Sequence, residues 1–537
     1  MKYVRLIAMF ICGFVLIANI LAGSKHEFSV RDFGAKGDGI TLDTKAIQKA
    51  VDKCAVAGGT VVFSSGKYLT GSIELKSNVD VYISAGATIL GSTNIKDYFE
   101  REPELKSYND AFLKHSLFYG EKLKNISIRG EGVIDGQGSF FKVTTKVKPD
   151  RYKNRPFIIR FIECENVRVE SLTLQNSAMW MQQYLACTDL FITGIKVINH
   201  ANQNNDMMDI DGCKNVIISD CIGDTDDDGI VLKSTSPRIT ENVVINNCVI
   251  SSHCNAIKMG TESTGGFKNV AISNIVIKPS RIEKVIFGQP QGISGITLAN
   301  VDGGNLDGVT ISNIVMDGPM VPIFMRLGNR ARKHTENAPI PSVGSFRNVN
   351  INNVVATNIK NIGASISGIP EHYVVDVQLS NIKIEYAGGI KKGNYNLEVE
   401  ELSENYPEST MWGNLPSYGF YIRHAQGIKL NNITLSYRET DERPAILLDD
   451  VKNIKLSFIE AEVSAEANCM VKIRNSHNIF IENSSAIGTA DYFLSIDDSL
   501  SESIFLKGND LRSFKMPFMQ KVDGQVKEAD NVSQSIK

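Results

Sequence analysis

The sequence has little of what marks several large classes of protein. Only 2 of its 537 residues are tryptophan and 15 are proline, the formal net charge is −3, and charged residues make up 22%. This balance excludes a collagen, a coiled coil and a disordered chain, and it gives no overall attraction to nucleic acid or to an anionic membrane. We therefore expect a globular protein in which an acidic ligand would need a local basic patch.

Cysteine is present without a recognisable pattern. The nine cysteines are scattered and form no Cys-x-x-Cys pair, which argues against a zinc site and against a dense disulfide framework. We expect no metal site and no cofactor, and we interpret most cysteines as small buried hydrophobic residues. Pairing of Cys213 with Cys221, or of Cys248 with Cys254, stays open.

An apolar run lies at the N-terminus. Lys2 and Arg5 precede it, the run covers residues 6–21, and small residues follow. This pattern is typical of a cleavable secretory signal, so we expect residues 1–23 to be removed and the rest to be exported, to the periplasm or outside the cell. A single membrane anchor is the alternative, but the run is short and no second basic stop follows it.

One short phrase recurs from residue 120 onward: Asn or Asp, an apolar residue, any residue and another apolar residue. Neighbouring copies are often about 25 residues apart, a spacing within the range of solenoid proteins. Each copy alternates apolar with polar positions and is rich in Val and Ile, which predicts a strand with one buried face. Stacked copies would bury a continuous apolar interior, so we predict an all-β fold, a parallel β-helix solenoid in which the Asn side chains form an inward-facing ladder. The copies begin at Asn125, Asn166, Asn215, Asn242, Asn269, Asn348, Asn453 and Asn478.

Two departures from the recurring phrase predict a cap at the end of the solenoid and loop insertions along it. Residues 43–54 have apolar positions at helical spacing, which predicts an N-terminal helix that covers the end of the stack. The phrase spacing lengthens over 269–348 and over 376–427, which predicts long loop insertions that shape a binding groove. No linker rich in Pro, Gly or Ser divides the chain, so we predict one domain over residues 24–537.

Carboxylates gather in two consecutive repeats. The segment Asn204–Asp206 is followed, about one coil later, by Asp226–Asp228. Equivalent positions of successive coils lie one above the other, so these carboxyls should share one face. Glycoside hydrolysis needs one carboxyl that stays protonated and another that stays ionised, and crowding of carboxyls raises the pKa of one of them. Acidic turns that bind calcium, or that only contact solvent, are the alternative.

The next repeat adds an imidazole and an ammonium. His253 and Lys258 lie about one further coil along the chain. A His stacked below an acidic cluster could tune the pKa of the acid or bind a sugar hydroxyl, whereas a purely structural His is the alternative.

These segments resemble the polygalacturonase family, glycoside hydrolase family 28, whose members are right-handed parallel β-helices. Asn204–Asp206 is similar to the family's Asn-Thr-Asp, and Asp226–Asp228 to its Gly-Asp-Asp. The opening Asp32–Gly39 also looks like the family's start, although other β-helix carbohydrate enzymes share it. The resemblance implies that Asp227 is the general acid, that Asp206 and Asp228 position and deprotonate the attacking water, and that the reaction inverts the anomeric centre.

The sequence departs from that family at two places. His253 matches the central His of the family's Gly-His-Gly, but Ser252 and Cys254 replace both glycines. The family's later Arg-Ile-Lys, which grips the substrate carboxylate, has no clear counterpart. Other cations could supply the charge, although each could also be an ordinary surface residue. The candidates are Lys233, Lys258, Arg326 and Arg330, with Trp180, Tyr406, Trp412 and Tyr418 as candidate sugar-stacking aromatics.

The resemblance and the carboxylates together favour a monomeric inverting hydrolase. Its partner would be an acidic plant cell-wall polysaccharide or oligosaccharide with galacturonic acid linkages, of the polygalacturonase or rhamnogalacturonan hydrolase type, and the insertions favour exo action. A polysaccharide lyase on the same scaffold is an alternative, but it would need calcium and a basic Arg or Lys, and no Arg lies in the acidic repeats. A β-helix that only binds polysaccharide is the other alternative.

Overall fold

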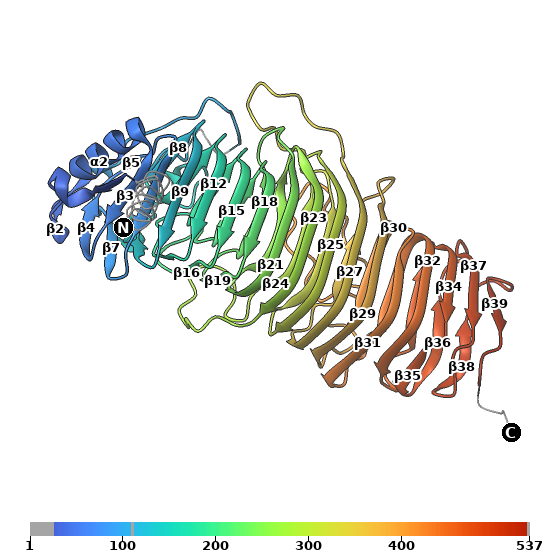
Figure 1. Ribbon diagram of the computed structural model, residues 1–537. Coiled ribbons are helices and arrows are strands. Elements are labelled where there is room, and N and C mark those ends of the chain that lie inside the picture. Colours follow the sequence, from blue (N-terminus) through green and yellow to red (C-terminus); the bar gives the residue numbers. More distant parts are fainter. Residues whose placement is uncertain (1–25, 109–111, 534–537) are drawn as a thin grey trace, which may run out of the picture.

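The computed structural model describes residues 26–108 and 112–533, so the expected signal segment lies outside the described residues. The described chain forms strands β1 (Glu27–Ser29) to β39 (Val526–Ala529), stacked along one long axis (Figure 1). Every pairing between these strands is parallel, and apart from a short one between β29 and β30 the pairings within the three columns join a strand to its equivalent in the neighbouring coil. The prediction of a right-handed parallel β-helix is confirmed.

Three columns of strands form the walls of the solenoid. The first column contains β8 (Ser116–Glu121), β11 (Phe157–Ile162), β14 (Gln182–Leu185), β17 (Met208–Asp211), β20 (Ile230–Ser234), β22 (Asn255–Ser263), β24 (Ser294–Asn300), β26 (Val321–Leu327), β28 (Ala364–Ser367) and β30 (Phe420–Gln426). The second contains β9 (Lys124–Gly130), β12 (Glu165–Glu170), β15 (Thr188–Thr193), β18 (Lys214–Ser219), β21 (Thr240–Ser252), β23 (Gly266–Ile277), β25 (Asn305–Asp317), β27 (Ser345–Ile359), β29 (Val374–Gly388) and β31 (Lys429–Glu439). The third contains β7 (Ala87–Gly91), β10 (Val133–Asp135), β13 (Thr173–Gln175), β16 (Lys196–Asn199) and β19 (Ile222–Thr225), and it continues into the second half of β21.

The recurring phrase forms the second column. In β18, Val216 and Ile218 are buried while Ile217, between them, is 41% exposed. Each buried position pairs with an apolar residue of the next coil, Val216 with Val243 for example, so the interior is a continuous apolar stack. Burial of each such side chain is worth about 2 kcal/mol, which makes this stack the main source of stability.

The recurring Asn forms a ladder, but not the inward-facing one that the sequence predicted. Asn242 donates from Nδ2 to Asn215 Oδ1 at 3.1 Å and accepts at its own Oδ1 from Asn269 Nδ2 at 3.1 Å. Asn242 has φ +57°, a left-handed conformation that Asn tolerates better than most residues. The ladder lies on the exposed surface, because this turn points the side chain away from the interior just before the strand begins to bury alternate residues.

The predicted capping helix is α2 (Thr44–Ala57), at the N-terminal end of the solenoid (Figure 1). It buries Ile47, Ala50, Val51 and Cys54 against the first coil. Asp43 precedes it but does not cap it, because its carboxylate accepts from the amide nitrogens of Lys36 and Gly37 instead. Nowhere in the described ranges is there a helix long and apolar enough to cross a membrane.

The predicted insertions leave the solenoid beside the first column. Residues 278–293 connect β23 to β24, residues 328–344 follow β26, and residues 389–419 connect β29 to β30. The eight cysteines of the described chain are all free and buried, so neither disulfide pairing left open by the sequence is formed.

Candidate active site

The predicted carboxylates lie just before strands of the first column. Asp206 precedes β17, and Asp227 and Asp228 precede β20. Met208 pairs with Ile230, and the amide of Met207 donates to the carbonyl of Asp228 at 2.9 Å, so the two segments are stacked in register. The structure therefore brings these three aspartates to one place.

Gly229 explains how the coil turns so tightly after the carboxylates. Its amide donates to the carbonyl of Asn255 at 2.8 Å, and a Cβ at this position would lie 2.3 Å from the carbonyl oxygen of Ala256. Any larger residue would push the coil that carries Asp227 and Asp228 away from the next one.

Asp227 is a carboxyl that holds its proton. Its side chain is 7% exposed, and burial followed by the charge of Asp228 raises its pKa to about 7. Asn204 donates to Asp227 Oδ2 at 3.4 Å, and the guanidinium of Arg155 in turn donates to Asn204 Oδ1 at 3.1 Å. Asp227 is thus held in one orientation by a neutral donor rather than ionised by a direct cationic partner.

Asp228 has the opposite surroundings. Its Oδ1 accepts from the side-chain amide of Asn255 at 2.7 Å, and its Oδ2 accepts from Lys258 Nζ at 2.7 Å. Both contacts stabilise the ionised carboxylate. Burial is offset at Lys258 by the charge of Asp228, so the pKa of this lysine is raised and it stays cationic.

Asp206 lies above this pair and is 2% exposed. Burial, and then the charges of Asp209 and Asp227, raise its pKa well above the ordinary value. Its Oδ1 makes no hydrogen bond, and Lys233 Nζ lies 3.8 Å from its Oδ2. Asp206 is therefore a second carboxyl that can hold a proton next to a cation.

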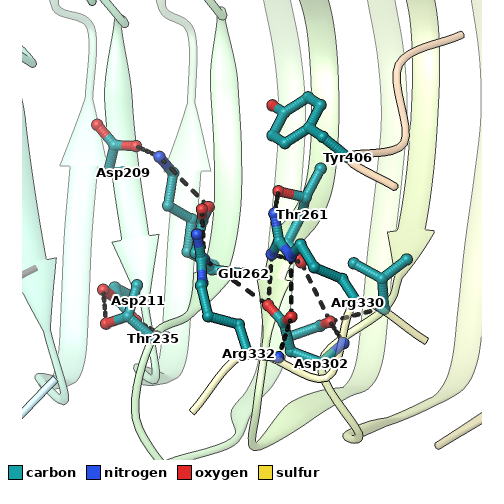
Figure 2. Close-up of polar contacts among 12 residues, drawn as sticks. Asp209, Asp211, Thr235, Thr261, Glu262, Asp302, Arg330, Arg332 and Tyr406 are labelled. Atoms are coloured by element: carbon teal, nitrogen blue, oxygen red, sulfur yellow. Dashed lines mark hydrogen bonds and ion pairs between the residues drawn. The ribbon is translucent and has the colours of Figure 1, made fainter. Parts of the chain in front are cut away.

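A series of consecutive ion pairs lies next to these carboxyls. Lys233 Nζ lies 2.9 Å from Asp209 and 3.9 Å from Glu262, which contacts Arg332 at 2.8 Å. Arg332 also contacts Asp302, and Asp302 pairs with Arg330. Figure 2 shows the labelled residues of this series from Asp209 to Arg330. Burial opposes ionisation of Glu262, but Lys233 and Arg332 outweigh it and lower its pKa.

The four cations expected to bind a substrate carboxylate divide into two groups. Lys233 and Lys258 line a cavity of about 280 Å³ together with the three aspartates. Arg326 is buried and donates to the carbonyl of Gly368 at 2.7 Å, and Arg330 donates to Asp302 at 2.9 Å, and neither lines the cavity. Arg326 and Arg330 therefore support the cavity from outside.

His253 lies behind the cavity rather than in its wall. Its ring is fully buried, its Nδ1 lies 3.0 Å from Asp226 Oδ1, and its Nε2 lies 3.2 Å from the carbonyl of Ile282. Asp226 and His253 point away from the cavity because they lie one residue before Asp227 and Cys254, and neighbouring side chains of an extended segment point to opposite sides. Contact between His253 and a sugar in the cavity would require movement of this layer.

A family model describes this arrangement. The model of the glycosyl hydrolases family 28 matches residues 54–406. The chain belongs to this family, and it is a glycoside hydrolase.

Individual proteins similar to this family 28 hydrolase support the family assignment. It is 29% identical over 408 residues to a probable polygalacturonase of Vitis vinifera, covering 73% of this chain and 81% of that protein. It is 35% identical over 149 residues to an exo-poly-alpha-D-galacturonosidase of Dickeya chrysanthemi, a match that covers 26% of this chain and 24% of that protein. A hyperthermoactive exopolygalacturonase of Thermotoga maritima superposes with a TM-score of 0.58 at 21% identity, covering 76% of this chain and 92% of that one, which shows the same fold.

Sequence reasoning about this hydrolase missed cavity residues that come from loops. Lys148 and Arg151 line the cavity, and in the described part of the chain neither has a carboxylate partner within ion-pair distance. Among the described residues, the Arg151 guanidinium donates to Gln203 Oε1, at 2.9 Å. The run of basic residues over 142–155 was the available signal, because it is the densest positive stretch near the acidic repeats. The insertions add Phe287, Arg332, Tyr406 and Glu408 to the cavity wall.

The candidate sugar-stacking aromatics also divide. Trp180 and Tyr406 line the cavity, and Lys233 Nζ lies 3.6 Å from the centre of the Trp180 ring. Trp412, within the 389–419 insertion, packs in a core cluster with Phe324 and Tyr421, and Tyr418 is fully buried in the main core. Only the first two can offer a ring face to a sugar in this conformation.

Proposed function

We propose that this family 28 hydrolase cleaves a galacturonic acid linkage of a pectic polysaccharide or oligosaccharide by a single displacement. The observation that carries the proposal is the pair of adjacent carboxyls, Asp227 and Asp228, with opposite surroundings in a cavity that also holds unpaired cations. One carboxyl that keeps its proton and one that is ionised are the two groups that glycoside hydrolysis requires.

The proton transfers follow from these surroundings. Asp227 donates its proton to the glycosidic oxygen as the bond to the sugar carbon breaks, so the leaving group departs as an alcohol. A water molecule attacks that carbon from the opposite face, and Asp228 takes its proton. Asp206, with its raised pKa, holds the water by a hydrogen bond. The cycle closes when Asp228 releases a proton to solvent and Asp227 takes one up, and the product has the inverted anomeric configuration.

Recognition of the uronic acid is assigned to cations without a carboxylate partner. Lys233 and Lys258 already contact the carboxyls of Asp209 and Asp228, so they are less available to a substrate carboxylate when the cavity is empty. Arg151 and Lys148 stay available, and a guanidinium can bind a carboxylate through two parallel hydrogen bonds. These loop residues replace the family's Arg-Ile-Lys, and Lys233 and Lys258 act on the ring hydroxyls and on the acid and base.

The loops that line the cavity favour exo action. Its lining includes residues of the 141–156 loop and of the insertions 278–293, 328–344 and 389–419, and also Tyr108, Phe112 and Leu113 from the segment before β8. An enzyme that cuts within a polymer needs a groove open at both ends, whereas a walled cavity accepts a chain end. The Dickeya chrysanthemi relative is an exo-poly-alpha-D-galacturonosidase, which points the same way.

We also propose that the enzyme works as an exported monomer, since its polymeric substrate lies outside the cell. Cell fractionation and size-exclusion chromatography of the mature protein test these two points.

The experiment that tests the function is product analysis on homogalacturonan, rhamnogalacturonan and oligosaccharides from each. We expect saturated uronic acid products, released as monomer or dimer from the first time point, and proton NMR should show the inverted anomer first. Asp227→Asn should abolish the release. An unsaturated product would indicate a lyase instead, and no cleavage of any acidic glycan would refute the substrate class.

A further inference from the structure

Three residues behind the cavity occupy equivalent positions in three successive coils. Asn199 pairs with Thr225 and Thr225 with Ser252, so the next residues, His200, Asp226 and His253, stack one above another. The amide of Asp226 donates to the carbonyl of Asn199 at 2.9 Å, and that of His253 to the carbonyl of Thr225 at 3.0 Å, which fixes this register. None of the three lines the cavity.

Nε2 of each imidazole, the nitrogen that faces away from Asp226, already has a hydrogen-bond partner. His200 Nε2 lies 2.9 Å from Asp224 Oδ1, a carboxylate that also accepts from Ser280 Oγ at 2.6 Å. His253 Nε2 lies 3.2 Å from the carbonyl of Ile282, which can only accept, so this nitrogen carries the hydrogen. With the hydrogen on Nε2, each imidazole can turn the lone pair of Nδ1 inward.

The two inner nitrogens face one carboxylate. His253 Nδ1 lies 3.0 Å and His200 Nδ1 lies 3.9 Å from Asp226 Oδ1, and the three ligand atoms lie within 4.8 Å of one another. His200 is only 8% exposed at its side chain, yet its Nδ1 makes no hydrogen bond. Lone pairs facing a carboxylate in a buried place repel it unless a proton or a metal cation lies between them.

We propose that His200 Nδ1, His253 Nδ1 and Asp226 Oδ1 bind a divalent transition metal ion of the zinc class. Two imidazoles and one carboxylate are a donor set that Zn²⁺ takes readily. An imidazole that binds a metal usually donates its other N–H to a carboxylate or carbonyl, as His200 does to Asp224 and His253 to Ile282. The sequence predicted no metal site because it has no closely spaced cysteines, whereas these ligands are a His, an Asp and a His one coil apart.

The ion would join three coils to the wall of the active site. The Asp226 carboxylate also accepts from the amides of Ile286 at 2.7 Å and Phe287 at 2.8 Å, in the 278–293 insertion, and Phe287 lines the cavity. Asp226 directly precedes Asp227, the proposed acid, in the chain. The site is structural: it holds the insertion and the acid in place and touches no substrate.

Metal binding is tested on the full protein without reference to activity. The protein is stripped with a chelator, dialysed, and titrated with Zn²⁺ and with Co²⁺, and bound metal is measured by elemental analysis. We expect one equivalent per chain, a higher Tm, and visible Co²⁺ absorption typical of low coordination number. Absence of stoichiometric uptake by the wild type would overturn the proposal and would leave a metal-free ion pair between His253 and Asp226.

Variants assign the ligands. His200→Gln keeps a donor for Asp224 but removes the inner nitrogen, so it should fold and bind Zn²⁺ at least about 100-fold more weakly. Cys254→Ser is the matched control, because Cys254 lies with Asp227 and Asp228 in the other group of potential ligands, and it should bind as the wild type does. Uptake that survives His200→Gln, or that is lost in Cys254→Ser, contradicts the assignment.

Discussion

Asp227 and Asp228 are neighbours in the chain, and the amide of Asp228 donates to Asp227 Oδ1 at 3.0 Å, but their carboxyls have opposite electrostatic surroundings. Burial and the nearby charge of Asp228 raise the pKa of Asp227 to about 7, while Lys258 and Asn255 stabilise the ionised form of Asp228. The two roles of the proposed mechanism are therefore set by what each side chain contacts and not by its type.

The carboxyl cluster predicts an unusual pH dependence of stability. Burial, opposed by Lys233, raises the pKa of Asp209 to about 7. The folded state then binds this proton more tightly than the unfolded state, so the contribution of Asp209 to stability is fully present below about pH 4 and is lost as the pH rises through 7. Urea unfolding at pH 4.5 and 7.5 gives the free energy of unfolding at each pH. Between these two pH values we expect it to fall by on the order of 3 kcal/mol less in Asp209→Asn than in the wild type.

The control for this prediction is Asp307→Asn. Asp307 lies near the surface, and Asn348, followed by Arg347, lowers its pKa, so it is ionised in both states across this range. Its variant should keep the wild-type slope. An Asp209→Asn variant whose stability changes with pH as much as that of the wild type would contradict the assignment.

The basic loop predicts a selective loss of substrate binding. Arg151→Ala removes a cavity guanidinium without a carboxylate partner, and a hydrogen bond to a charged group is worth about 1.5–3 kcal/mol. We expect KM on an acidic oligosaccharide to rise about 10- to 100-fold with a smaller change in kcat. Lys153→Ala, in the same loop but exposed and paired with Asp150, should leave KM unchanged. Equal effects of the two variants would show that only the general charge of the loop matters.

The Asn ladder predicts a measurable share of the stability. Asn242→Ala loses two ladder hydrogen bonds and places Ala at φ +57°, which together cost about 2 kcal/mol. Asn242→Gly loses the same bonds but accepts the left-handed conformation, so it should be the more stable of the two in thermal unfolding. An Ala variant at least as stable as the Gly variant would show that the backbone conformation contributes nothing.

The parts of the molecule that the sequence predicted are those set by local pattern. Alternation around Val216 and the spacing between copies are enough to specify strands, their burial and their stacking, because each coil contacts mainly its neighbours. The stacking of Asp206 on Asp228 follows from the same spacing.

The parts that the sequence did not predict depend on loop paths and side-chain direction. Arg151 and Arg332 reach the cavity from loops that no repeat constrains, and Arg330, two residues away, pairs with Asp302 instead. His253 was placed under the carboxylates by spacing, but spacing does not say to which side of the coil wall a ring points.

The most direct test of the central claim, that Asp227 is the proton donor, compares leaving groups. Asp227→Asn should lose about 10²- to 10⁴-fold in kcat/KM on a galacturonic acid oligosaccharide, but should retain nearly wild-type activity on galacturonosyl fluoride, whose leaving group needs no proton. Asp228→Asn should lose activity on both substrates. If Asp227→Asn lost activity equally on the oligosaccharide and the fluoride, Asp227 would not be the acid and the account would be contradicted.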